Sequence, residues 1–485
     1  MIQSILLTAI VAAIAWGALA FGAVYPWAYT PLAAGCAAIG VAGLTAGRRD
    51  RPPISRLAIG LAAIGIAISL QLVPLPRTVL TSVSPGTDAF LRQYDLSYTH
   101  PVSAGDRSPD EIRDSELPWH PVSIAPAKTA LGLGLFSALA LFMLGTTRVL
   151  SIAGARPVAL AVLGLGLLLT VLAVIQIALN PNASEFTLIY GFWRPQGVST
   201  PFGPFVNPNH YAGWMLMALP LVLGLAQAAL QGTTLAGRGV RDRVLWAASE
   251  EGGTLVLSLC AGLIMGVSLM MTRSRSGIAC LVVAIALSGG MLFLRQRRAS
   301  ARIAVAAAFV FVFLGAVAWA GVDTMLGKFQ ASGREVSLSS RVNTWKDTVR
   351  IIRDSPVMGT GFDTYGTAMM VYQTSRQGEH FQEAHNDYLQ LAAEGGLLVG
   401  LPILFTLAIF VAEVRRRFRE APKEGMTYWL RVGAVVGLIA IALQSLIEFS
   451  LQMPGNAVLW SVLAALALHQ SPRLRPASAR SASPL

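Results

Sequence analysis

Long apolar runs alternate with polar connectors along the whole chain. Many of these runs have the length that a membrane-crossing helix needs, about 17–25 residues, and they recur from one end of the chain to the other. We therefore expect an all-α polytopic membrane protein. About twelve spans of this length are predicted, near residues 4–24, 29–47, 57–75, 127–146, 157–179, 209–229, 253–271, 277–294, 303–321, 396–414, 430–449 and 455–470.

Two polar segments are long enough to fold outside the membrane. The first, at about residues 76–128, is acidic and proline-rich, and we expect a loop with little core of its own. The second, residues 322–395, contains "SSRVNTWKDTVRIIRDSP", in which apolar positions from Val342 to Ile352 recur at helical spacing. This spacing predicts an amphipathic helix that lies along the membrane surface.

Charge sets the expected orientation of these segments. Only 13% of the residues are charged, about half the usual share in a soluble protein. The net charge of +12 comes from arginine-rich connectors that alternate with connectors nearly free of charge. This is the positive-inside pattern, so it predicts cytoplasmic basic connectors, cytoplasmic termini and two external polar segments, and it argues against nucleic-acid binding. No Lys or Arg precedes the first run, so we expect a retained span instead of a cleaved signal peptide.

Polar chemistry gathers on the predicted external face. "MTRSRSG" places Arg273 and Arg275 in a very short connector between two apolar runs, against the charge bias. Such arginines either reach lipid headgroups or line a pocket for a bound diphosphate, whose oxygens match the guanidinium fork. Arg341 and Arg194 are two further external arginines, and each has the alternative of a solvated surface residue.

Two more external stretches carry candidate groups. "FVNPNHYAGW" has the form of a helix start, with Asn207 or Asn209 as the cap. In "EAHNDYLQLAAEGG", His385 is a candidate base, and Glu383 or Asp387 is a candidate partner that orients its ring. The metal-binding patterns Asp-x-Asp, His-x-x-x-His and paired Cys are absent, so we expect neither a metal nor another cofactor.

Three motifs together resemble a known family. "SRSG" at the end of one span, "SSRVNTWKD" with "DSPVMGTGFDTY" in the large external segment, and "HNDYLQLAAEGGLLVGLP" entering the next span are similar to the O-antigen ligase superfamily. The resemblance covers roughly Phe192–Gln470. It implies N-terminal transmembrane helices over residues 1–180, a catalytic membrane region over 181–470, and a basic cytoplasmic tail over 471–485.

The resemblance also implies an activity. Members of this family move a glycan from undecaprenyl diphosphate to an acceptor hydroxyl on the periplasmic face of the bacterial inner membrane, without a metal. Their catalytic arginines and histidine match Arg275, Arg341 and His385, although Arg273 leaves open which residue of "TRSR" is the counterpart. Further substrate-binding candidates are Arg194, Arg273, Asn209, Asn386 and Tyr388.

Three functions remain open at this point. A ligase transfers the glycan to lipid A–core and a polymerase transfers it to another lipid-linked glycan; we favour the ligase, although both use the same donor. The third is a transporter of lipid-linked glycans, which would need ionisable residues near the bilayer midplane. The predicted spans are almost free of them, with Glu448 near a span end as the main exception, so chemistry at one face is favoured.

Overall fold

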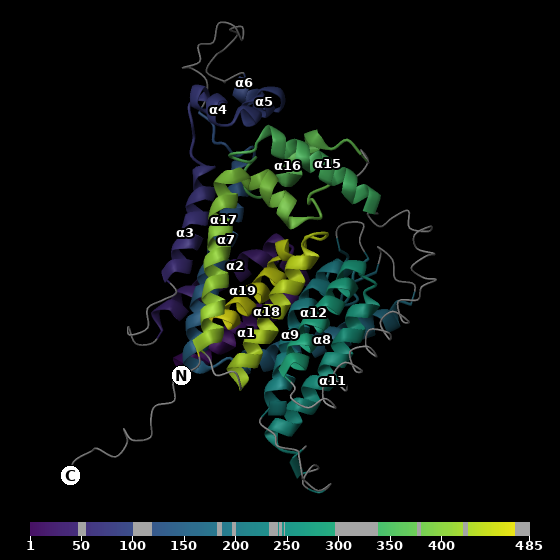
Figure 1. Ribbon diagram of the computed structural model, residues 1–485. Coiled ribbons are helices and arrows are strands. Elements are labelled where there is room, and N and C mark those ends of the chain that lie inside the picture. The colour runs from purple at the N-terminus through teal and green to yellow at the C-terminus, as the bar shows by residue number, and fades with distance from the viewer. Residues whose placement is uncertain are drawn as a thin grey trace, which may run out of the picture.

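A computed structural model of the chain shows a bundle of helices (Figure 1). The described residues contain helices and isolated β-bridges but no strand, which agrees with the predicted all-α class. They are residues 1–46, 55–99, 119–181, 187–195, 200–231, 241, 245–246, 248–295, 338–375, 380–420 and 425–470.

Eight helices in the described parts of the chain are long and apolar enough to cross a membrane. They are α1 (Ile2–Leu19), α2 (Pro26–Thr45), α7 (Pro126–Ala153), α8 (Arg156–Leu179), α9 (Pro208–Gln231), α11 (Glu250–Met271), α17 (Asp387–Glu420) and α18 (Met426–Gln444). Shorter apolar helices are α3 (Ser55–Leu70), α12 (Arg275–Arg295) and α19 (Pro454–Leu468). Each of these helices falls on a predicted span. The predicted span at 303–321 lies outside the described residues, so the count of twelve stays a prediction.

One predicted boundary was wrong at the first span, which was expected to reach residue 24: α1 ends at Leu19 and a short 3₁₀ turn, η1 (Phe21–Ala23), follows. The span predicted from residue 396 coincides with the part of α17 that follows a kink at Gly396, and further helical turns precede the kink from Asp387. Gly396 has a φ of 53°, and a Cβ there would lie 2.6 Å from the amide nitrogen of Gly359. Glycine is therefore required at this close approach.

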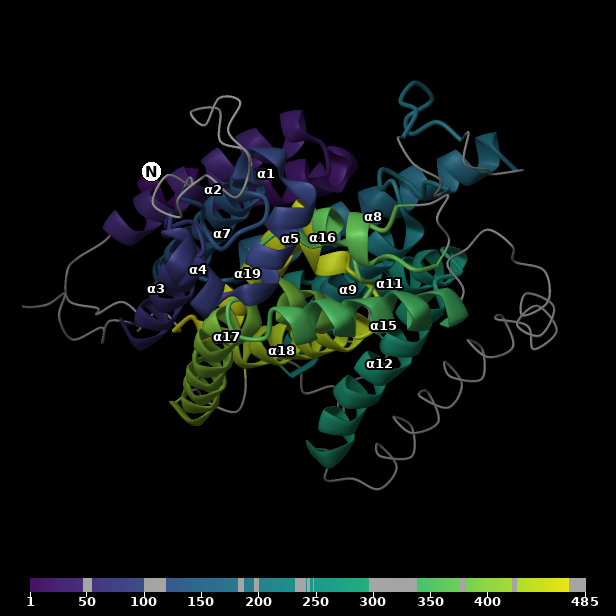
Figure 2. The same cartoon turned by 90° about the horizontal axis from the view of Figure 1, so that it is seen from above.

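One end of the bundle is covered by short helices, and we call it the capped end (Figures 1 and 2). The first polar segment contributes α4 (Arg77–Val83), α5 (Pro85–Tyr94) and α6 (Leu96–Thr99). They enclose a small cluster in which Leu80, Leu91 and Tyr98 are buried. The expectation of a loop with little core was thus wrong for residues 77–99, because short runs of apolar residues suffice once they pack together.

The second polar segment contributes α15 (Leu338–Asp354) and α16 (Tyr365–Tyr372) to the same end. The amphipathic helix was predicted correctly, but not its buried face. Val342 is 40% exposed, whereas Thr344 and Thr348 are buried. Each hydroxyl donates to the main-chain carbonyl one turn earlier, which makes the polar burial tolerable.

The position of the capped end relative to the bundle follows from the packing of α9 and α18. α9 is the most enclosed candidate span, with 83% of its apolar stretch buried. α18 packs closely against α9 because Gly437 has no side chain: a Cβ there would lie 2.8 Å from the carbonyl oxygen of Met217 in α9. The start of α9 thereby meets the end of α18, where Gln444 Nε2 donates to the Asn209 carbonyl at 3.3 Å.

Candidate functional site

The segment before α17 fixes His385 in an unusual backbone conformation. His385 has a φ of 51°, in the left-handed region that few non-glycine residues adopt. Its neighbours hold it there: the Ala384 amide donates to Gln390 Oε1 at 2.9 Å, and Trp345 Nε1 donates to the Ala384 carbonyl at 3.0 Å. Asn386 Oδ1 accepts the Leu389 amide at 3.0 Å and so caps α17. The imidazole therefore projects from a rigid turn.

Glu448 is the centre of the site. It lies in the connection between α18 and α19 and is only 1% exposed. Its Oε1 accepts hydrogen bonds from Arg341 Nη2 at 2.6 Å and from Asn209 Nδ2 at 2.9 Å. Its Oε2 lies 3.6 Å from His385 Nδ1. One carboxylate thus joins α15, the start of α9 and the turn before α17.

The surroundings of Glu448 keep it ionised. Burial alone would raise the pKa of this carboxyl, but the adjacent His385 and the positive charge of Arg341 outweigh burial. The pKa of Glu448 is consequently held below its usual value. The negative charge of Glu448 lies beside the imidazole of His385, where it stabilises the positive charge that a general base acquires when it takes a proton.

Phe449 separates His385 from a second histidine. Its ring meets the ring of His385 edge to face at a centroid distance of 4.8 Å, and that of His210 at 4.9 Å. His210 is 3% exposed, and neither ring nitrogen has a hydrogen-bond partner among the described residues. Burial of unpaired polar atoms is costly and is common at functional sites.

The expected orienting carboxylates of His385 were wrong. Glu383 interacts electrostatically with Asp363 and Lys128 instead, and burial, then Asp363, raises its pKa to about 7. The pKa of Asp363 is raised to about 6, again by burial. Asp387 Oδ1 accepts a hydrogen bond from Gln452 at 2.8 Å. The acid that faces His385 is Glu448, which lies far away in the sequence, in the connection between α18 and α19.

The structure brings together three of the predicted site residues and assigns local contacts to others. Arg341, Asn209 and His385 meet at Glu448, as described above. Tyr388, named as a substrate contact, donates its hydroxyl to the Ala442 carbonyl at 2.8 Å. Asn386 caps α17, as described above.

Two of the remaining predicted arginines lie at helix ends and one lies in a connection. Arg273 follows α11 with a φ of 56°, and Arg275 is the first residue of α12. Gly277, in the same turn, would place a Cβ 2.7 Å from that of Ala212 in α9, so this turn lies beside the start of α9. Arg194 follows Trp193 in the segment between α8 and α9.

Sequence reasoning missed Glu448 and His210 as site residues. The available signal for Glu448 was its isolation, since it is an acid at the end of an otherwise apolar span. For His210 the signal was its place beside Asn209 at a helix start. As for metals, the part of the chain that the structure describes has no group of three or more His, Cys, Asp or Glu side chains that could hold an ion.

Comparisons with known proteins place this geometry in context. Residues 260–405 match the family model of the O-antigen ligase domain. The matched stretch includes Arg275, Arg341 and His385, whereas Asn209 and Glu448 lie outside it.

One curated relative is the exopolysaccharide production protein ExoQ of Rhizobium meliloti, which is 27% identical over 211 residues. This alignment covers 40% of the present chain and 45% of ExoQ, so the chain spans less than half the length of that relative. Residues 260–405 are thus similar to the O-antigen ligase family, which confirms the resemblance to the O-antigen ligase superfamily.

Proposed function

We propose that the chain is a membrane glycosyltransferase that moves a glycan from undecaprenyl diphosphate to an acceptor hydroxyl. The observation that carries this proposal is the meeting of His385 and Arg341 at the buried carboxylate of Glu448. A base, a cation and the acid that couples them come from three separate parts of the chain. A purely structural ion pair would not need the histidine.

The residues divide the chemistry as follows. With Nδ1 of His385 turned to Glu448, Nε2 takes the proton of the acceptor hydroxyl. The acceptor oxygen attacks the anomeric carbon of the glycan, the bond from that carbon to the diphosphate oxygen breaks, and its electron pair leaves with the diphosphate. Glu448 stabilises the imidazolium that forms.

Arginines stabilise the leaving group in this proposal. The diphosphate gains negative charge as it departs, and a guanidinium is well suited to bind it because its fork matches phosphate oxygens. Arg275 and Arg341 take this role, with Arg273 and Arg194 as further phosphate contacts. The side chain of Arg341 is 16% exposed beside Glu448, and its Nε has no hydrogen-bond partner within the described structure.

The proposed cellular arrangement follows from the charge pattern. The protein is placed in the bacterial inner membrane with both termini in the cytoplasm and the capped end in the periplasm. There it meets the lipid-linked donor and either lipid A–core or a second glycan as acceptor. The external polar segments, which bring α15 and His385 to this end, support that orientation.

Two acceptors define two candidate reactions. The first candidate is transfer to lipid A–core, the reaction after which the matched O-antigen ligase family is named. The relative ExoQ is named for exopolysaccharide production, and this observation favours polymerisation of a lipid-linked glycan as the second candidate. Both reactions require the same donor, the same base and the same arginines.

Glycan analysis of a deletion strain tests the proposal and separates the two reactions. The native host lacking this gene is complemented with the wild type or with His385→Ala, and its surface and lipid-linked glycans are compared. Uncapped lipid A–core with accumulated lipid-linked polymer indicates the ligase. Core that bears a single repeat, or loss of exopolysaccharide, indicates the polymerase. Unchanged glycans in the deletion strain would refute the proposal.

Transport of lipid-linked glycans is the rival of a different class. The ionisable cluster around Glu448 lies at the capped end, beyond the last residue of α18, and a transporter would place such groups near the midplane. The same strains discriminate the two, because a transporter with His385→Ala would accumulate its lipid-linked glycan on the cytoplasmic side. A glycosyltransferase with this change accumulates it on the periplasmic side.

A further inference from the structure

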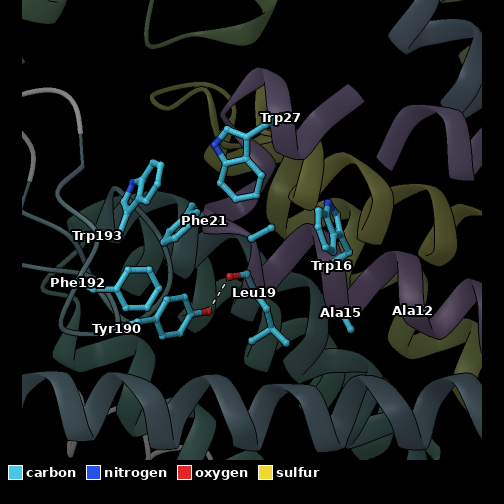
Figure 3. Close-up of a pocket in the computed structure, with 10 residues that line it drawn as sticks. Ala12, Ala15, Trp16, Leu19, Phe21, Trp27, Tyr190, Phe192 and Trp193 are labelled. Carbon is cyan, nitrogen blue, oxygen red and sulfur yellow. Dashed lines mark hydrogen bonds between the residues drawn. The ribbon is translucent and has the colours of Figure 1, made fainter. Parts of the chain in front are cut away.

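An aromatic groove lies where α1 ends and α2 begins, in the N-terminal part of the chain that the family model does not cover. Figure 3 shows the residues that line it. It has a volume of about 590 Å³. Its base includes the alanines Ala12 and Ala15 of α1, and its walls carry aromatic rings, among them Trp16, Phe21 and Trp193. Because the alanines are small and the rings are large, the space between them along α1 stays open and forms a groove.

The backbone is held in unusual conformations to build these walls. Phe21 has a φ of 61° and Tyr190 a φ of 55°, both in the left-handed region. Phe21 stacks on Trp193 at a centroid distance of 5.0 Å, which joins η1 to the segment before α9. Such strain persists only where surrounding contacts impose it, and it is typical of binding sites.

The polar atoms of the rings are already used within the protein. Trp16 Nε1 donates to the Ala28 carbonyl at 2.9 Å, and Trp193 Nε1 donates to the Tyr25 hydroxyl at 3.2 Å. The Tyr190 hydroxyl donates to the Leu19 carbonyl at 2.6 Å. The groove thus offers ring faces and methyl groups, so a sugar or a lipid headgroup would lose its hydrogen bonds there. The chemistry fits a hydrocarbon chain.

The shape of the groove also fits a chain. Its lining extends along α1 from Leu19 to Ala12, which corresponds to about 10 Å at 1.5 Å per residue. α1 is one of the candidate membrane spans, so this direction leads from the capped end into the apolar layer. Trp16 is 43% exposed and Phe192 is 73% exposed, and the groove is open along that side.

The groove lies next to the segment that leads to the candidate site. Gly22, next to Phe21, would place a Cβ 3.2 Å from the ring of Phe205, and Phe205 is followed by the "NPN" turn that holds Asn209. Arg194 follows the wall residue Trp193 in the chain. A hydrocarbon groove next to the segment that leads to the catalytic turn is complementary to the tail of an anionic lipid whose headgroup reaches the site.

We propose that this groove binds the isoprenoid chain of the lipid-linked donor, in the part next to the diphosphate. The proposal rests on the function proposed above. Rigid aromatic walls suit a methyl-branched, unsaturated chain because its flat isoprene units lie against ring faces. The groove is also in contact with the segment that leads to the candidate site, and this neighbourhood favours the donor lipid over bulk lipid. The diphosphate then lies towards the arginines, while the remainder of the chain extends into the bilayer.

Photolabelling of the full-length protein in lipid nanodiscs tests this assignment. The probe is a glycan-free polyprenyl diphosphate with a photoreactive group in its first isoprene units, used in the His385→Ala background so that no turnover is needed. Label is expected in peptides that contain Ala12–Trp27 and Tyr190–Trp193. Excess unlabelled polyprenyl diphosphate should remove most of it, and excess phosphatidylglycerol should not.

Three variants sharpen the experiment. Ala15→Trp fills the groove and should lower specific labelling at least fivefold; with His385 intact it should raise the KM for the donor about tenfold with little change in kcat. Phe192→Ala removes one exposed wall ring without altering a helix and should have a smaller effect in the same direction. Leu263→Trp, at a 69% exposed position of α11, is the matched control and should change neither quantity.

The outcomes separate failure of the groove from failure of the function. Absence of label from both peptides, or equal labelling by a photoreactive phosphatidylglycerol, overturns the groove assignment even if glycan transfer is observed. Specific labelling that Ala15→Trp abolishes supports the groove. That result would stand even if the deletion strain showed no change in its glycans, in which case only the proposed function would fail.

Discussion

The two ends of α18 each carry a buried charge, and the two charges are treated in opposite ways. Arg431, near the start of the helix, and Glu448, just beyond its end, are both 1% exposed. Arg431 donates to main-chain carbonyls only: Nε to Ala467 at 3.0 Å, Nη1 to Arg417 at 3.2 Å and Nη2 to His469 at 2.6 Å. Glu448 bonds to side chains only, and its Oε2 has no hydrogen-bond partner within the described structure.

This difference indicates which buried charge is architectural and which is functional. The carbonyls bound by Arg431 lie at the ends of α17 and α19, where helices leave such groups unsatisfied. Arg431 is therefore a cap that ties two helices to a third. Glu448 instead gathers a cation, an amide and an imidazole from other elements and retains an unused oxygen, an arrangement that serves chemistry better than stability.

Replacement of His385 by Ala gives the largest expected effect at the Glu448 end. The transfer rate should fall by about 10³-fold, since a positioned general base contributes on the order of 10²–10⁴. Membrane insertion and donor binding should be retained, and both are measurable on the purified protein. His380→Ala, in the exposed part of the same segment, is the control and should be close to wild type. Substantial transfer by His385→Ala would exclude the base role.

Replacement of Glu448 by Gln tests whether charge, and not only packing, matters at this end. The amide keeps the size of the side chain but cannot stabilise an imidazolium, so kcat should fall about 100-fold with a smaller change in KM. Glu448→Asp keeps the charge and should restore part of the rate. Equal activity of wild type and Glu448→Gln would show that the carboxylate is as structural as Arg431.

Replacement of Arg431 by Met should affect stability and leave the chemistry intact. It removes three hydrogen bonds to carbonyls, which corresponds to an expected loss on the order of 3 kcal/mol. Thermal unfolding in detergent measures this loss, and transfer per folded molecule should remain within about twofold of wild type. A folded Arg431→Met protein with a strongly reduced transfer rate would show that Arg431 also takes part in transfer, so that the two ends of α18 would not differ in role.

The same comparison shows what could be predicted from the sequence. The helices of the bundle are local features, because each apolar run and its caps specify a helix whatever its neighbours are. The motifs around Arg341 and His385 were likewise recognisable. The pairing of His385 with Glu448 was not, since it depends on how the start of α17 packs against the end of α18, where the Asp387 amide donates to the Ser445 carbonyl. Glu383 lies much nearer to His385 in the chain. Short sequence separation favoured the wrong carboxylate.

The smallest expected effect comes from Glu383, the neighbour that does not face His385. Its pKa is raised to about 7, first by burial and then by Asp363, whereas an unfolded Glu titrates near pH 4.3. The folded protein therefore binds the extra proton more tightly, and stability decreases as the pH rises from about 4.5 towards and just past 7. Glu383→Gln cannot ionise and should avoid this loss. Its Tm should match wild type at pH 5 and exceed it by a few degrees at pH 8, with transfer unchanged. A tenfold loss of transfer would mean that Glu383, and not Glu448 alone, acts on the histidine.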